Sequence, residues 1–510
     1  MPLSILIWLP LAGALVGALL PARLARWPSL LASLGALGLS IALIVQIGNA
    51  ADSAKLHDVT NELWIEPLGV HYALGIDGLN VFLITLATLM FTATLAWCAR
   101  TEWRRERLFY LFLGIAQTAV LGALCAQDLI LFAAFFDLML IPFFFLAGIW
   151  GGSRQADGSA TPETVAAVTK LVIYTLVGSL LMLAAAIAAG VLSEGPGGEL
   201  NFTFAALQQA HLSTTSQEWI FLFFAAAFVV KMPQFPVHGW MPDGYRAMPL
   251  PVLAVFSGVL SKVAAYGFLR IVLPIFPAGA VHFQMLMLII ALASILYGSA
   301  LAFTTTNVRL VLGYSSVAQL GFILLGIFSL KSAGDQGSLL QALNHGLVVV
   351  PAFLIIALLA ARAGGSEDLR DLGGIATRAP VLATLFLIVT FALLAMPGSA
   401  NFVGEFFILL GTFQSKMAIS IVAFAGVVAA AVYALRLFIS TMHNRTGPKV
   451  ASHEMSWRDA MVIAPLVAVL VAIAVYPQFA LHRSAPSVNK ALTQTKAQQQ
   501  SSSGTVARVP

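Results

Sequence analysis

The sequence predicts an all-α polytopic membrane protein of about fourteen transmembrane helices, with two inverted five-helix repeats that each contain a discontinuous helix. Three observations support this prediction. Of the 510 residues, 59% are hydrophobic and only 10% are charged, whereas soluble domains have about 25% charged residues. Apolar stretches of about 20 residues, the length that spans a bilayer, recur along the chain. Two of these stretches contain prolines and a charged residue at a depth where an ordinary spanning helix has neither.

The apolar stretches give the predicted helices in chain order. The first, 3–20, is interpreted as an uncleaved helix, because no positive region precedes it and Arg23 and Arg26 follow it. The others are predicted at 30–48, 79–98, 108–125, 128–150, 166–192, 219–245 (broken), 250–273, 283–303, 308–330, 338–361, 381–412 (broken), 417–441 and 459–478. The predicted units are an N-terminal part (1–107), a first repeat (108–273), an inverted second repeat (283–441), a last helix within 442–485 and a polar, disordered tail (486–510).

Basic residues are concentrated in the loops after odd-numbered helices. These loops carry Arg23, Arg26, Arg100, Arg104, Arg105, Arg107, Arg154, Arg246, Arg309, Arg362, Arg370, Arg378, Arg445 and Lys449. Because cytoplasmic loops hold the excess of Lys and Arg, both termini are predicted on the outer side. The formal net charge of +5 does not indicate a nucleic-acid partner, since the basic residues lie between apolar segments instead of on one folded face.

The stretch 219–251, WIFLFFAAAFVVKMPQFPVHGWMPDGYRAMPLP, is predicted to be the first broken helix. Twelve apolar or small residues precede Lys231, which places it near the bilayer centre, where a charge costs about 2.5 kcal/mol or more. Pro233 and Pro236 each remove a backbone donor, so the freed carbonyls need a protein interior or a wet cavity. The alternative is that Lys231 lies near a helix end and its ammonium group reaches the membrane surface.

The second broken helix begins near Leu382 and is interrupted at Pro397 and Gly398, with Glu405 buried beyond the break. Paired interrupted helices in two halves of a membrane protein indicate an ion or substrate path.

Further buried charges complete a predicted proton relay. Asp137 lies too deep in an apolar run for its short side chain to reach water, so Lys231 is its expected partner; the alternative is a hydrogen bond to a neighbouring helix. Lys262 is central in its own helix. Buried acids and lysines in one plane of the bilayer can exchange protons, which predicts a relay of Asp137, Lys231, Lys262 and Glu405. A purely structural membrane scaffold would not need so many buried charges.

Two histidines and one lysine are weaker candidates. His345 could bridge Lys262 and Glu405, or it could be a neutral histidine of the core. His238 stands beside the first helix break, where it could transfer protons or cap freed carbonyls. Lys170 lies near the start of its helix and could reach the surface.

We expect no cofactor or metal site in this chain. The two cysteines, Cys98 and Cys125, are isolated in apolar runs and cannot build a disulfide framework or a four-cysteine cluster. Neither GxGxxG nor GxxxxGK follows a strand-like run, so a nucleotide site is not expected either.

Five segments carry a resemblance to a known family: VKMPQFPVHGWMPDGYRAMP, SKVAAYGFLRIVLPIFP, GYSSVAQLGFILLGI, NHGL and MPGSANFVGEFFILLGTF. They resemble the antiporter-like membrane subunits of respiratory complex I, a superfamily that also contains Mrp-type sodium/proton antiporters and membrane-bound hydrogenase subunits. The match extends from about the third to the thirteenth helix. The chain has no room for the long lateral helix that one type of these subunits adds.

The resemblance implies a role for each relay residue. Lys231 corresponds to the central lysine of the seventh helix, Asp137 to the fifth-helix acid, Lys262 to the connecting lysine of the eighth helix and Glu405 to the acid of the exit path. It also implies a proton-translocating subunit of an NADH:quinone oxidoreductase in the bacterial inner membrane, beside the neighbouring subunits L and N. NADH, FMN, iron–sulfur clusters and quinone would be bound by other subunits. The alternative is a subunit of an Mrp-type Na⁺/H⁺ antiporter or of a membrane-bound hydrogenase.

The sequence departs from the family pattern at three places. The fifth-helix acid is usually glutamate, so the shorter Asp137 predicts a looser or water-bridged pair. Gln319 stands where many members have a histidine, and an amide does not change its protonation state in the working range. Gly244 and Tyr245 replace the usual Ala-His after the PD of the broken helix.

Overall fold

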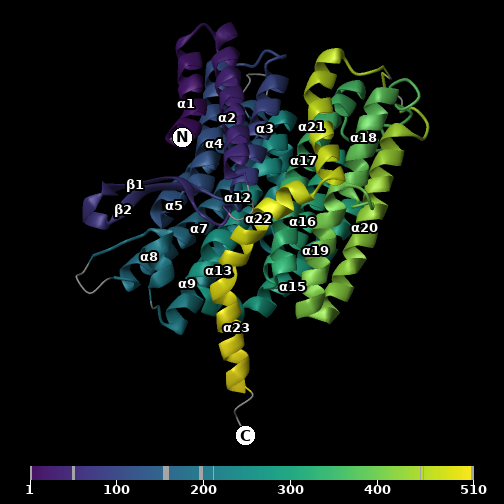
Figure 1. The fold of residues 1–510 in the computed structure, drawn as a ribbon. Helices are drawn as coiled ribbons and strands as arrows, with labels where there is room; N and C mark the ends of the chain where they lie inside the picture. The colour runs from purple at the N-terminus through teal and green to yellow at the C-terminus, as the bar shows by residue number, and fades with distance from the viewer. Residues whose placement is uncertain are drawn as a thin grey trace.

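The structure is a computed structural model that describes residues 3–48, 52–152, 160–194, 199–210, 212–447, 450–451 and 453–506, the last five with backbone only. It is a helical bundle (Figure 1), which confirms the all-α polytopic class. Arg154, Lys449 and the last residues of the predicted tail (507–510) lie outside the described residues.

The helices that form the bundle follow the predicted order closely. They are α1 (Leu3–Leu19), α2 (Arg26–Ile47), α3 (Val81–Cys98), α4 (Glu106–Cys125), α5 (Leu129–Leu138), α6 (Leu140–Trp150), α7 (Pro162–Leu192), α9 (Thr214–Lys231), α10 (Met241–Ala247), α11 (Leu250–Val255), α12 (Ser261–Gly267), α13 (Leu273–Ile275), α15 (Gln284–Thr304), α16 (Val308–Ile327), α17 (Ser332–Arg362), α18 (Pro380–Leu393), α19 (Ala400–Ser415), α20 (Met417–Met442) and α21 (Trp457–Val475). Two short helices, α8 (Phe204–Gln209) and α14 (Pro277–His282), lie in connections.

Eleven helices in the described part of the chain are long and apolar enough to cross a membrane. The shorter apolar helices α1 and α18 are additional to these. The predicted total of about fourteen membrane-spanning helices requires three further crossings of the membrane, by α1, by α9 together with α10, and by α18 together with α19. This total and the inverted repeats therefore stay predictions.

Both predicted helix breaks are present. Helix α9 ends at Lys231, and a 3₁₀ turn over Val237–Trp240 precedes α10. Pro233 and Pro236 explain the interruption, because neither can donate a backbone hydrogen bond. Between α18 and α19 the chain turns through Ala395 and Gly398, both with positive φ, on either side of Pro397. The chain therefore contains two discontinuous helices, as predicted.

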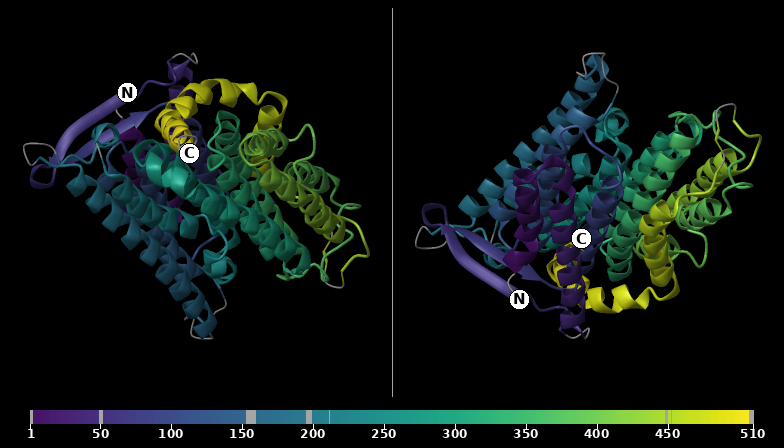
Figure 2. Two further views of the ribbon diagram at one scale, coloured as in Figure 1. Left: turned by 90° about the horizontal axis from the view of Figure 1, so that it is seen from below. Right: turned by 90° about the horizontal axis from the view of Figure 1, so that it is seen from above.

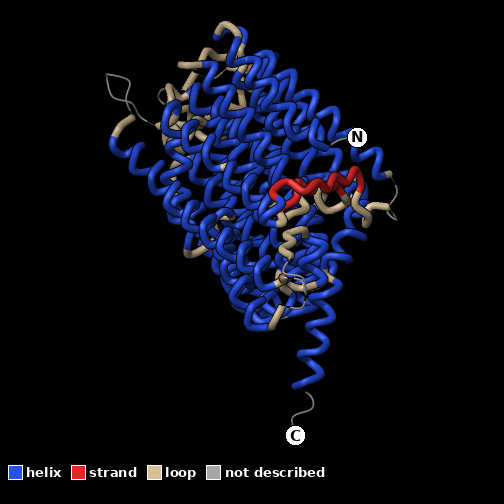
Figure 3. The backbone as a smooth tube through the Cα atoms, turned by 90° about the vertical axis from the view of Figure 1, so that its left-hand side faces the viewer, coloured by secondary structure: helices blue, strands red, loops and turns tan. Residues whose placement is uncertain are grey.

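A β-hairpin that the sequence analysis did not predict joins α2 to α3. Strands β1 (His57–Ile65) and β2 (Val70–Ile76) pair antiparallel on the outside of the bundle (Figure 3). Gly69 in the turn has φ +59°, and a Cβ there would collide with the carbonyl of Leu200, so glycine is required. The hairpin lies at the left of Figure 1, at about mid-height; we call the end of the bundle below it, where α23 leaves, the hairpin end, and the opposite end, where the α1–α2 connection carries Arg23, the arginine end.

The prediction of a disordered tail is wrong, because the tail is helical as far as residue 506. Helices α22 (Gln478–Ala491) and α23 (Thr493–Val506) cross the hairpin end of the bundle (Figure 2). Although α22 is polar on average, its apolar and small residues are spaced to give one buried face that includes Leu481, Ser484 and Val488. Thr495 then fixes α23 by donating a hydrogen bond from Oγ1 to the Leu273 carbonyl at 2.6 Å.

Candidate functional site

The predicted relay residues lie on helices that pack against one another in succession. Helix α9 contacts α12, α12 contacts α17, and α17 contacts α19. These four helices carry Lys231, Lys262, His345 and Glu405 respectively, all four buried. Helix α5 carries Asp137 and contacts α7, which packs on α9. The sequence order of these groups is therefore also their spatial order.

Lys231 is held inside the bundle at the last residue of α9. Its side chain is 7% exposed, so its ammonium group does not reach the surface as the alternative required. Nζ donates a hydrogen bond to the Phe136 carbonyl at 3.3 Å and lies 4.4 Å from the centre of the Phe136 ring, a cation–π contact. The receiving backbone belongs to the kink between α5 and α6, which Pro142 favours because it cannot donate to Leu138.

Asp137 and Lys231 interact through their charges without a direct ion pair. The carboxyl and the ammonium act on each other electrostatically, yet they are not among the ion pairs in the described part of the chain. The Asp137 Oδ1 atom is buried without a hydrogen-bond partner, and Ser179 on α7 lies beside the carboxyl group. This geometry is that of the looser pair expected when aspartate replaces glutamate.

A small cavity separates Lys231 from the groups that bind Lys262. Its lining includes Lys231, Thr175, Ser257 and Ser261, and it leaves about 10 Å³ for the centre of a water molecule, roughly the minimum for one water. Lys262 Nζ donates to the Ser257 carbonyl at 2.8 Å and to Ser261 Oγ at 3.2 Å. One water in this cavity would join the surroundings of the two lysines.

The helix that carries Lys262 is widened beside it. A π-helical turn over Phe256–Leu260 changes the regular backbone bonding just before α12, a deviation common at functional sites. The Tyr245 hydroxyl donates to Ser257 Oγ at 3.0 Å. Tyr245 thus binds a serine whose carbonyl holds Lys262.

His345 lies close to Lys262 because two glycines bring their helices together. A Cβ on Gly346 would be 2.8 Å from the Gly258 carbonyl oxygen, and a Cβ on Gly258 would be 2.5 Å from a Val350 methyl group. Small residues at such crossings let helix backbones approach closely. Lys262 acts on His345 electrostatically, and both ring nitrogens of this buried histidine lack a hydrogen-bond partner in the part of the chain that the structure describes.

Glu405 is bound by two glutamine side chains. Nε2 of Gln319 donates to its Oε1 atom at 2.8 Å, and Nε2 of Gln341 lies 3.5 Å from the same oxygen. The other carboxyl oxygen, Oε2, is buried and has no hydrogen-bond partner among the residues that the structure describes. Gln341 lies one turn before His345 on α17, so the two side chains share a helix face and connect His345 to Glu405.

His238 is not joined to these groups. Its ring lies 5.1 Å from that of Tyr297 and 6.0 Å from that of Phe235, and its Nδ1 atom lacks a partner. The Val230 carbonyl beside the break is capped by Trp240 Nε1 at 3.1 Å. Among the described residues, no hydrogen bond or ion pair links His238 to the other candidates.

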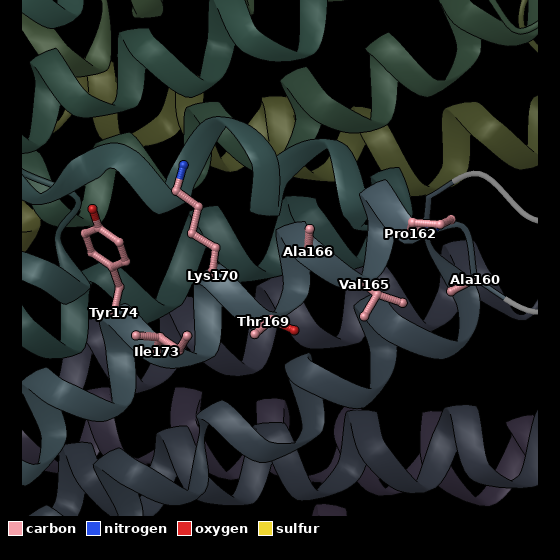
Figure 4. Close-up of a pocket in the computed structure, with 8 residues that line it drawn as sticks. All are labelled: Ala160, Pro162, Val165, Ala166, Thr169, Lys170, Ile173 and Tyr174. Carbon is pink, nitrogen blue, oxygen red and sulfur yellow. The ribbon is translucent and has the colours of Figure 1, made fainter.

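Several partners of the candidate residues were not predicted from the sequence. Lys170, expected to reach the surface, pairs with Asp243 at 2.8 Å, and Arg246 lies 3.8 Å from the same carboxylate. Figure 4 shows the pocket on α7 where the Lys170 ammonium and the Tyr174 hydroxyl point to the same side. The PD motif was the available signal for Asp243. Gln341 gave no signal in its sequence context.

A second missed pair lies at the hairpin end. Arg270 Nη2 donates to Asp77 Oδ1 at 2.6 Å, and Arg270 Nε donates to the Tyr266 hydroxyl at 3.1 Å. This pair ties the segment after β2 to the second π-helical turn of the α11–α13 span, Phe268–Val272.

Residues 126–432 match the sequence model of the family described as NADH:quinone oxidoreductase/Mrp antiporter, transmembrane. The chain belongs to this family. It is 34% identical to NADH-quinone oxidoreductase subunit M of Rhodobacter capsulatus, over 95% of each chain. It is 33% identical to subunit M of Escherichia coli K12, over 89% of this chain and 90% of the relative.

Solved structures of the family share the fold. A chain of respiratory complex I from Thermus thermophilus superimposes with a TM-score of 0.85 and 29% identity, covering 96% of this chain and 99% of that one. A chain of the Mrp complex from Dietzia superimposes with a TM-score of 0.84 over 98% of each chain. The Dietzia chain is 21% identical, so this second likeness concerns the fold alone.

Proposed function

We propose that this chain is a proton-translocating membrane subunit of an NADH:quinone oxidoreductase in a bacterial inner membrane, with both termini on the outer side. The observation that carries the proposal is the row of ionisable side chains on packed helices, which runs from the half-buried Asp137 through three buried residues to the buried Glu405. Subunit M relatives at 33–34% identity over most of the chain support the same function. NADH, FMN, iron–sulfur clusters and quinone belong to other subunits in this proposal, and antiporter-like subunits L and N are its neighbours.

Protons pass between side chains that are one water or one helix contact apart. A water in the cavity beside Lys231 links its ammonium group to the Ser257 and Ser261 groups that hold Lys262. His345 has two free ring nitrogens next to Lys262, so it can accept a proton on one nitrogen and release one from the other. Water beside Gln341, on the face of α17 that His345 shares, carries the proton from His345 to Glu405, because the amide itself does not change its protonation state.

A Mrp-type antiporter subunit is the rival, because it would use the same buried residues without electron transfer. The higher identity of the complex I chain in structural superposition favours the oxidoreductase: 29% for the Thermus thermophilus complex I chain against 21% for the Dietzia Mrp chain.

The test is NADH-driven proton uptake by inverted membrane vesicles that contain the native complex. Lys262→Ala and Glu405→Gln should abolish coupled uptake in a complex that assembles normally on a native gel. Lys416→Ala, at an exposed lysine outside the relay, is the matched control and should keep full uptake. Driven Na⁺/H⁺ exchange by the isolated chain would overturn the proposal in favour of the antiporter.

A further inference from the structure

Asp335 is a buried acid that the relay described above does not use. It lies in the first turn of α17, its side chain is 0% exposed, and both carboxyl oxygens lack a hydrogen-bond partner among the described residues. A carboxyl group removed from water without a partner is costly to keep, and such residues in membrane proteins mark ion paths by default. Among the described residues, the Asp335 side chain makes no hydrogen bond that would give it a structural role.

The position of Asp335 continues the row of relay groups toward the hairpin end. It precedes Gln341 by six residues on α17 (335 to 341), which corresponds to roughly 9 Å along the helix. Ser338 lies one turn from each of them and donates from Oγ to the carbonyls of Ile323 and Gly334. The interval between Glu405 and Asp335 is therefore lined by a hydroxyl and an amide.

Close helix contact keeps this interval short. A Cβ on Gly337 would be 2.7 Å from the Ile408 backbone nitrogen, and a Cβ on Gly411 would collide with the backbone of Gly334. On α19, Gly411 follows Glu405 by six residues. On α17, Gly334 precedes Gln341 by seven residues, which is a similar distance along the helix. The antiparallel helices α17 and α19 thus run together from the Glu405 level to the Asp335 level.

The tail brings an opposite charge to Asp335. Lys496 on α23 acts on its carboxyl group electrostatically, although the two side chains are not among the ion pairs of the described residues. Lys496 follows Thr495, whose buried hydroxyl anchors α23 on Leu273. Ser332, in the same turn as Asp335, is hydrogen-bonded to Asn489 of α22. Figure 1 shows α23 leaving the bundle at its hairpin end.

We propose that Asp335 is the outlet group of the proton path and that Lys496 is a positioning residue that favours its release of the proton. The inference rests on the proposed function. The Glu405 carboxyl group gives its proton to a water molecule beside Ser338 and Gln341, and water gives a proton to an Asp335 carboxylate oxygen, so that at each transfer one O–H bond breaks and one forms. The Lys496 ammonium group then favours the Asp335 carboxylate, and the proton passes to water at the hairpin end.

The test compares variants of the assembled complex in inverted vesicles by NADH-driven proton uptake and NADH:quinone turnover. Asp335→Asn should reduce coupled uptake by more than about tenfold, because the amide cannot carry a proton, and Asp335→Glu should restore it. Lys496→Gln should reduce uptake by up to about fivefold, and Lys496→Arg should restore it. The double variant Asp335→Asn/Lys496→Gln should be no worse than Asp335→Asn alone.

A control on the same tail excludes a general effect of α22 and α23. Lys490→Gln changes an exposed lysine that donates to the Ala54 carbonyl and should leave uptake unchanged. Normal uptake by assembled Asp335→Asn, or full uptake by Lys496→Gln, would overturn the outlet. If Asp335→Asn does not assemble, the Lys496 variants decide alone. If Glu405→Gln loses uptake while Asp335→Asn keeps normal uptake, only the outlet is refuted. If Glu405→Gln, Asp335→Asn and Lys262→Ala all keep normal uptake, the proposed function is refuted.

Discussion

Gln341 donates a hydrogen bond from Nε2 to Oε1 of Gln319 at 2.7 Å, while Gln319 donates from its own Nε2 to Glu405 at 2.8 Å. Because Gln341 occupies the oxygen of the Gln319 side chain, the amide group of Gln319 is oriented with its hydrogens toward the carboxyl group. Gln319 therefore presents a donor to the Glu405 carboxyl group, a contact that favours its carboxylate form.

Gln319→Leu should reduce NADH-driven proton uptake, because Glu405 loses its shortest hydrogen bond and the Gln341 amide loses its acceptor. Gln319→His should retain uptake, since an imidazole can donate to the same oxygen and can also carry a proton. Gln209→Leu, at an exposed position of α8, is the control. Equal uptake by Gln319→Leu and wild type would show that this hydrogen bond is not needed.

Asp137→Asn and Lys231→Ala should each strongly reduce coupled quinone reduction in an assembled complex. Removing the carboxylate leaves Lys231 buried with only a carbonyl and an aromatic ring beside it. Asp137→Glu should be tolerated, because it keeps the charge and extends its reach toward Lys231. The measurement is NADH-driven proton uptake with assembly checked on a native gel. Near-normal pumping by Asp137→Asn would contradict the role of the charge pair.

Gly346→Ala should lower the free energy of unfolding of the subunit by about 1–3 kcal/mol and impair proton uptake. The added Cβ would lie 2.8 Å from the Gly258 carbonyl oxygen, so the α17 backbone must move away from Lys262. Gly38→Ala is the matched control, because a Cβ at Gly38 on α2 meets no atom within 4 Å. Thermal unfolding of the purified complex measures the difference. Equal stability of the two variants would mean that the crossing adapts without cost.

Labelling from the outer side should modify a cysteine at position 62 and spare one at position 102. Glu62 is exposed on the hairpin, and Glu102 is exposed in the loop between α3 and α4. The native Cys98 and Cys125 are buried and give little background. A membrane-impermeant maleimide added to intact cells that express Glu62→Cys or Glu102→Cys measures accessibility. Preferential labelling at position 102 would reverse the predicted orientation.

The burial of charged side chains could be predicted because a charge within an apolar run is visible in the sequence itself. Lys231 and Glu405 are of this kind, and so are the prolines that interrupt their helices. The hydrogen bonds around Glu405 could not be predicted, since Gln319 and Gln341 lie on different helices and meet only through packing.

Other features were missed because the local signal was weak. The predicted helix began at residue 338, whereas α17 begins at Ser332, so Asp335 was assigned to a loop. Gly334 and Gly337 lower the helix propensity of this turn and conceal its start. The hairpin and α22 were missed because a search for long apolar runs does not detect short strands or a polar helix with one buried face.

The glycine contact between Gly258 and Gly346 also limits how the proposed proton path can open and close. Two backbones in atomic contact cannot slide past each other by a helical turn without first separating, so the register of α17 against the Lys262 helix is fixed. Switching must then come from rotation of the lysine and histidine side chains and from entry or loss of single waters. A crosslink that locks these two helices together should therefore leave turnover intact.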